Sequence, residues 1–206
     1  MDMKSMTLED FTEALASKQA VPGGGGASAL TASLAAALGC MVGELTVGKK
    51  KYAANEPELR ELMARAAVLR ARLLELIEDD AAAFEPLARA YAIPKDEPER
   101  DEIMEKCLLA AAGPPMEILE LSCEIIVLQE GFARLGSDMA VSDAGTGAVL
   151  AWSAMYAAAL NVLANTRSMK DRARAEAMNA RVKELMDSHW KLADRVYEEV
   201  YGKLSL

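Results

Sequence analysis

Residues 21–28 read Val21-Pro22-Gly23-Gly24-Gly25-Gly26-Ala27-Ser28, and a long segment rich in Ala, Gly, Ser and Leu follows them. This segment predicts a helix from about residue 26 to 47, because Ala and Leu favour helices and no β-type alternation is present. Consecutive glycines leave backbone N–H groups accessible, and a helix start carries unpaired N–H donors with a partial positive charge. The run is therefore a candidate anion-binding site, with a simple hinge as the alternative.

The remainder of the chain also predicts helices, since Ala, Leu, Glu, Met and Arg dominate it. We expect a break at Gly113-Pro114-Pro115, where two prolines remove N–H donors. The expected helices cover about residues 7–18, 26–47, 57–91, 97–111, 116–134, 139–165 and 170–201. The fold class is an all-α, single-domain bundle of long helices spanning residues 1–206.

Two of these helices, residues 26–47 and 139–165, have small side chains on most sides. Small side chains let helix backbones approach closely, so both helices are expected at the centre of the bundle. The alternative is a subunit interface, for which a symmetric homodimer is the commonest arrangement.

The composition narrows the class of protein. A chain of 206 residues with 52% hydrophobic residues can form one globular domain, and a net charge of −9 disfavours nucleic-acid binding. No signal peptide is evident, and the nearly uncharged segments 26–43 and 139–164 contain Ala, Gly and Ser rather than strongly apolar residues, so we expect no membrane span. Scattered Cys40, Cys107 and Cys123 indicate reduced thiols and a cytoplasmic protein.

Carboxylates are the main candidates for catalytic groups, because His189 is the only histidine and no metal-ligand spacing is evident. Asp143 interrupts an otherwise uncharged helix, where a carboxylate is costly to bury unless it is paired or used. A helix N-cap is the alternative explanation for Asp143. Asp79 and Asp80 interrupt another helix, and a solvated acidic face explains them equally well.

Polar and basic residues supply candidate binding groups. Asn161 and Asn165 are one turn apart and share a face of an apolar helix, which suits hydrogen bonding to a polar heterocycle or across helices. Lys49, Lys50 and Lys51 follow the glycine-rich helix. They either complement the helix dipole in solvent or attract an anionic ligand.

In these segments the chain resembles the cyclodeaminase/cyclohydrolase family of folate enzymes over nearly its whole length. The segments that carry the resemblance, in order, are Pro22–Gly26, Leu45–Tyr52, Asp80–Phe84, Pro115–Glu117, Ser142–Gly145 and Asn161–Thr166. Glu44 departs from an expected Asn, and Gly26 stands where serine is frequent. The four-glycine run favours the stand-alone methenyltetrahydrofolate cyclohydrolases over the cyclodeaminases.

The resemblance implies a homodimer that binds a tetrahydrofolate derivative, with no metal and no cofactor beyond the folate. The implied activity is hydrolysis of 5,10-methenyltetrahydrofolate to 10-formyltetrahydrofolate. The alternatives are formiminotetrahydrofolate cyclodeaminase activity, which releases ammonia, and a non-catalytic folate-binding or scaffold protein. Neither nucleic acid nor membrane is an expected partner.

The resemblance also implies roles for the candidate residues. Asp143 is the first choice for the proton-transferring carboxylate and Asp80 is the second. Lys49, Lys50 and Lys51 are expected to attract the glutamate tail, and Asn161 and Asn165 to orient the pterin. The expected backbone donors to pterin or carboxylate oxygens are Gly23, Gly24, Gly25 and Gly26.

Overall fold

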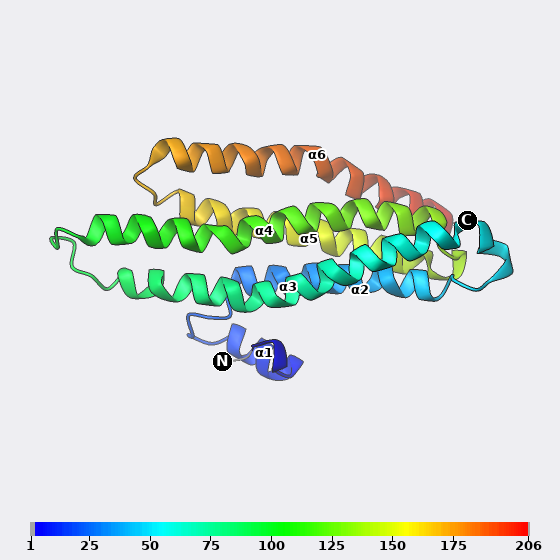
Figure 1. Cartoon of the computed structure of the whole chain (residues 1–206), viewed down its shortest axis with the longest axis horizontal. Helices are drawn as coiled ribbons and strands as arrows, with labels where there is room; N and C mark the ends of the chain where they lie inside the picture. Colours follow the sequence, from blue (N-terminus) through cyan, green and yellow to red (C-terminus); the bar gives the residue numbers. More distant parts are fainter. Residues whose placement is uncertain (1–2, 206) are drawn as a thin grey trace.

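The computed structural model describes residues 3–205 and contains helices and turns, with no β-strand over that range. Five long helices lie roughly parallel in an elongated bundle (Figure 1). They are α2 (Gly24–Glu44), α3 (Glu56–Ala90), α4 (Arg100–Leu135), α5 (Val141–Thr166) and α6 (Arg172–Leu204). A short helix, α1 (Leu8–Leu15), lies on the outside of the bundle (Figure 1). The prediction of an all-α bundle is confirmed.

Only one face of α2 and one face of α5 pack inside the bundle. Helix α2 packs against α3, α4 and α5, and α5 packs against α2, α4 and α6. Their inward alanines, among them Ala32, Ala36, Ala148 and Ala158, are fully buried. Their opposite faces carry exposed residues, so the expected central position is only half correct.

Helix α4 corrects one prediction, because it continues through Gly113-Pro114-Pro115 as a single helix. Pro115 has no N–H group, so the carbonyl of Ala111 loses its partner within the helix. Asn165 Nδ2 of α5 donates to that carbonyl oxygen at 3.1 Å. A side chain from a distant segment thus supplies the missing hydrogen bond, which local sequence could not reveal.

Helix α2 begins at Gly24, earlier than predicted, with Gly23 as its N-cap. Gly24, Gly25 and Gly26 therefore form the first helical turn and not a loop. The helix ends at Glu44, and a 3-10 turn follows at Lys50–Asn55. The three lysines consequently lie beyond the helix rather than in its last turn.

Two segments are long and apolar enough to cross a membrane by length and composition alone, Gly24–Glu44 and Asp138–Thr166. In these two segments 56% and 44% of the most apolar stretch is buried inside the bundle. Core helices of soluble proteins meet the same criterion, so this finding is weak evidence for a membrane span.

Candidate functional site

A cavity of about 230 Å³ lies where the start of α2 meets the last third of α3, the α4 segment around its prolines and the last turns of α5. A smaller apolar cluster, distinct from the main hydrophobic core, joins the end of α3 to the first half of α4 and includes the lining residue Ala111. The residues that line the cavity are Ala20, Val21, Gly23, Gly24, Gly25, Asp80, Phe84, Ala111, Pro115, Asn161, Ala164 and Asn165. The cavity thus joins four of the six segments that carry the family resemblance.

Asp80 supplies the carboxyl group of this cavity. A Cβ atom built on Gly25 would lie 2.1 Å from Asp80 Oδ1, so only glycine leaves space for the carboxyl group here. Burial raises the pKa of Asp80 to about 6, and a hydrogen bond from the Gly26 N–H partly opposes that rise. At neutral pH a group with this pKa both accepts and returns a proton readily.

The neighbouring carboxylate, Asp79, has a different environment. Its Oδ2 lies 2.8 Å from Arg72 Nη1 on the outer surface, and Arg72 also binds Glu75 and Glu117. The predicted solvated acidic face therefore describes Asp79, whereas Asp80 lines the cavity.

Asn161 and Asn165 extend from α5 into the same cavity, where the first faces the glycine run. A Cβ atom on Gly24 would lie 2.9 Å from Asn161 Oδ1, and Asn161 Nδ2 donates to the Ala157 carbonyl at 2.8 Å. Asn165 Nδ2 donates to the carbonyls of Ala111 and Asn161. The amide nitrogen of each asparagine thus donates to backbone carbonyl groups. Within residues 3–205 neither amide oxygen accepts a hydrogen bond, so both can accept one from a ligand N–H.

Asn165→Ala is expected to destabilise the protein by about 1–3 kcal/mol, because the Ala111 carbonyl then lacks a donor. In a Pro115→Ala background the helix itself supplies that donor, so the same substitution should cost less. Urea unfolding of the four proteins in this double-mutant cycle measures the difference. Equal losses in both backgrounds would contradict the explanation given for the uninterrupted α4.

The remaining predicted residues lie at the opposite end of the bundle. Asp143 is in the first turn of α5, and 18 residues separate it from Asn161, a rise of about 27 Å. The alternative explanation, a helix N-cap, is wrong, because the N-cap of α5 is Ala140 and Asp143 is the third residue of the helix. Asp143 therefore does not share a cavity with Asp80 in one chain.

The lysines also lie far from the cavity. Lys49 Nζ donates to Ser137 Oγ at 3.3 Å, and Lys51 Nζ lies 2.6 Å from Asp138 Oδ2. These contacts connect the turn after α2 with the turn between α4 and α5. None of the three lysines is among the residues that line the cavity of Asp80.

Sequence reasoning missed the contribution of the α4 prolines to the site. Pro115 lines the cavity and frees the Ala111 carbonyl that holds Asn165. The Pro-Pro pair was the available signal, but it was interpreted as a helix break. Phe84, which closes another side of the cavity, belongs to a segment quoted for the resemblance without a role of its own.

Together these features define an all-helical bundle that holds one carboxyl group of raised pKa against a glycine-lined helix start. Residues 7–184 match the sequence model of the Formiminotransferase-cyclodeaminase family. The chain belongs to this family.

Named relatives carry two related activities. The chain is 36% identical to a methenyltetrahydrofolate cyclohydrolase of Methylorubrum extorquens, over 97% of this chain and 98% of that protein. It is 29% identical to the formimidoyltransferase-cyclodeaminase of Mus musculus, over 87% of this chain but only 34% of the longer protein. A solved formiminotetrahydrofolate cyclodeaminase of Thermotoga maritima superposes with a TM-score of 0.83 at 25% identity, over 98% of this chain and 97% of that one.

Proposed function

We propose that this protein hydrolyses 5,10-methenyltetrahydrofolate to 10-formyltetrahydrofolate with Asp80 as the acid–base group. The observation that carries the proposal is the partly buried Asp80 carboxyl group, with its pKa raised to about 6, in the glycine-lined cavity. The near-full-length similarity to a stand-alone cyclohydrolase supports the reaction class.

The reaction requires a group that takes up and returns a single proton. Water adds to the cationic carbon that bridges N5 and N10, and Asp80 accepts one proton of that water. The C–N5 bond of the resulting carbinolamine then breaks, and Asp80 returns its proton to N5. The hydroxyl proton leaves to solvent as the formyl group forms on N10, so one proton is released in total.

The surroundings of Asp80 suit this sequence of steps. Its ionised form offsets the cationic charge of the substrate, and that attraction is strong where water is largely excluded. The free amide oxygens of Asn161 and Asn165 accept hydrogen bonds from pterin N–H groups. The N–H groups of Gly24 and Gly25, which line the cavity in the first turn of α2, donate to pterin oxygen atoms.

The rate should decrease as pH decreases through about 6, because protonated Asp80 cannot accept a proton from water. Below this pH, kcat/KM is expected to decrease about tenfold per pH unit, which reports the ionisation of a single group in the free enzyme. Initial rates between pH 4.5 and 8, corrected for spontaneous hydrolysis, measure the profile. A profile that is flat down to pH 4.5 would exclude Asp80 as the base.

The first assay is the loss of 5,10-methenyltetrahydrofolate absorbance with and without the purified protein. Accelerated loss supports cyclohydrolase activity. The second candidate is formiminotetrahydrofolate cyclodeaminase activity, which the relatives of that name favour. Ammonia release from 5-formiminotetrahydrofolate without accelerated hydrolysis would select it, and failure of both assays would leave a folate-binding protein.

Several expectations from the resemblance remain proposals. We propose a cytoplasmic homodimer that uses no metal and no cofactor beyond the folate. Lys49, Lys50 and Lys51 are proposed to attract the glutamate tail, and Asp143 to assist the cationic substrate. Asp80 replaces Asp143 as the first choice for proton transfer, because Asp80 lines the cavity.

A further inference from the structure

Phe84 supplies an aromatic ring to the cavity that contains Asp80. The two residues lie four positions apart in α3, so they share one face of the helix and are separated by a rise of about 6 Å. The Phe84 side chain is half-buried and packs against the apolar cluster that includes Leu87, Leu108 and Ala111. One helix therefore presents a carboxyl group and an anchored aromatic ring to the same cavity.

The cavity has room for one end of a folate and not for the whole molecule. Its volume of about 230 Å³ is below the roughly 300–1,000 Å³ of sites that enclose a drug-sized ligand. Within residues 3–205 its lining includes no lysine or arginine, and a glutamate tail placed there would meet the carboxyl group of Asp80. The fused rings with their one-carbon bridge are therefore the end that enters, and the glutamate tail remains outside.

The one-carbon bridge of 5,10-methenyltetrahydrofolate carries a positive charge, which N5, the bridging carbon and N10 share. The face of a benzene ring is electron-rich and attracts a cation that lies within about 6 Å of the ring centroid. A bridge that is close enough to Asp80 for proton transfer lies about one helical turn from Phe84. The product, 10-formyltetrahydrofolate, is neutral at this position, so the attraction applies to the substrate and not to the product.

We propose that the ring of Phe84 binds the cationic bridge of the substrate and thereby distinguishes 5,10-methenyltetrahydrofolate from its neutral product. Asp80 faces the bridging carbon as the proton acceptor, and Phe84 attracts the cation without competing for a proton. The positive charge decreases as water adds to the bridge, so the ring strengthens binding of the substrate and does not accelerate the chemical step. This inference rests on the proposed function, because it takes the cavity as the site of the folate rings.

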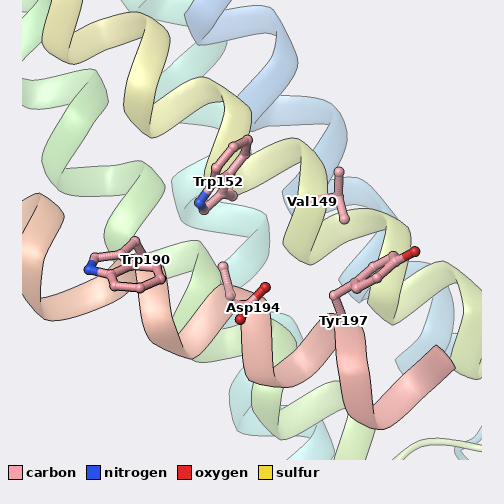
Figure 2. Close-up of a pocket in the computed structure, with 6 residues that line it drawn as sticks. Val149, Trp152, Trp190, Asp194 and Tyr197 are labelled. Carbon is pink, nitrogen blue, oxygen red and sulfur yellow. The ribbon is translucent and has the colours of Figure 1, made fainter. Parts of the chain in front are cut away.

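A second hollow also combines aromatic rings with a carboxyl group. Figure 2 shows Val149 and Trp152 of α5 opposite Trp190, Asp194 and Tyr197 of α6, around a hollow of about 390 Å³. Asp194 is exposed, so water and salt weaken its attraction for a cation. In the described part of the chain the lining of this hollow includes no asparagine or glycine that could bind the edge of a pteridine. The glycine-lined cavity is therefore the better match to the cationic folate.

Fluorination of Phe84 tests the charge interaction with little change in the shape of the side chain. Phenylalanine analogues with one to five fluorine atoms, incorporated at this position alone, progressively remove the attraction of the ring for a cation. KM for the substrate is expected to increase with each fluorine and to reach about ten times the wild-type value, which corresponds to about 1.4 kcal/mol. The value of kcat should remain within about twofold of wild type, because the lost interaction belongs to the bound substrate. A KM that is independent of the number of fluorine atoms would overturn the proposal.

Phe84→Leu removes the ring and keeps an apolar side chain. This variant should raise KM about tenfold with little change in kcat, and should weaken inhibition by 10-formyltetrahydrofolate much less. Phe84→Tyr keeps an aromatic face and should restore the wild-type KM. Displacement of Asp80 would instead lower kcat and affect substrate and product alike, so that result would overturn the proposal. If Phe84→Leu does not fold, the fluorinated series decides the question, since its members keep the ring.

Trp190→Leu is the matched control for the loss of an aromatic ring. Trp190 is 38% exposed in the second hollow, and its replacement should leave KM and kcat at wild-type values. An increase in KM for Trp190→Leu, with none for Phe84→Leu, would place the cation in the second hollow and overturn the proposal.

Binding to Asp80→Asn protein separates this inference from the proposed function. Stopped-flow difference absorbance of 5,10-methenyltetrahydrofolate measures its affinity, and adding Phe84→Leu to this background should raise Kd about tenfold. A wild-type protein that does not accelerate hydrolysis, together with this tenfold effect on binding, would overturn the proposed function and leave the role of Phe84 standing. An active wild-type protein with no effect of Phe84→Leu on Kd would overturn the role of Phe84 alone. A wild-type protein that does not bind the substrate would overturn both.

Discussion

Asp80→Asn is expected to lower kcat/KM for methenyltetrahydrofolate hydrolysis by about 10³-fold, within the range for removal of a general acid–base group. Asparagine has the same shape as aspartate, and its amide oxygen still accepts the hydrogen bond from the Gly26 N–H. The substitution thus removes the proton acceptor and leaves the cavity in place. Absorbance decay of the substrate, with the spontaneous rate subtracted, measures the loss.

The same variant should be more stable than wild type at neutral pH. Burial raises the pKa of Asp80 from 3.8 to about 6, so the ionised carboxylate destabilises the folded state by up to about 3 kcal/mol. This penalty is absent below pH 4, where Asp80 is protonated in both folded and unfolded states, and it is complete above pH 6. Thermal unfolding at pH 4 and pH 7.5 should show a higher Tm for the variant only at the higher pH.

Opposite changes in activity and stability distinguish a catalytic Asp80 from a structural one. A structural carboxylate that holds the helices together would give a variant that is less stable at pH 7.5. An inactive and destabilised Asp80→Asn protein would therefore contradict the role proposed here. Full activity would assign proton transfer to another group, with Asp143 the first to examine by the same substitution.

Gly25→Ala is expected to lower kcat/KM by about 10²-fold or more, because displacement of a catalytic group by about 1 Å has effects of this size. The new methyl group would lie 2.1 Å from Asp80 Oδ1 and 2.4 Å from its Cγ, so the carboxyl group must move. Overpacking of this kind also destabilises the fold by about 1–3 kcal/mol. Steady-state kinetics and urea unfolding measure the two effects.

Gly202→Ala is the matched control for this substitution. Gly202 lies in helix α6, and a Cβ atom there would have no neighbour within 4 Å. Alanine favours a helix over glycine by about 1 kcal/mol, so this variant should be as active as wild type and slightly more stable. If Gly25→Ala behaved like Gly202→Ala, the close approach of α2 to Asp80 would have no catalytic significance.

The fold followed from local sequence to a large extent. Helix α3 was predicted from its apolar spacing over residues 57–91 and is observed at Glu56–Ala90. Helix-forming residues and the lack of alternating β-branched residues determine such segments without reference to the rest of the chain. The continuous α4 was wrongly divided, because the donor to the Ala111 carbonyl is the side chain of Asn165, 54 residues away.

The candidate site was predicted in its components but not in its arrangement. The sequence points to the glycine run, Asp80 and the two asparagines, which line one cavity, but it favours Asp143 because that carboxylate interrupts an uncharged helix. Asp80 follows Glu78 and Asp79 in an acidic run, and local sequence cannot show which of them faces inward.

The amino-acid sequence by itself determined that the protein is a helical bundle, which family it resembles and which residue types are available for acid–base chemistry. These properties depend on local helix preference and on the order of short motifs. The tertiary structure decided that Asp79 meets Arg72 at the surface while Asp80 meets Gly25 in a cavity. The physical reason is that the partial burial that raises the pKa of Asp80 arises only when α2 packs against α3, while Asp79 on the next position pairs with Arg72 at the surface.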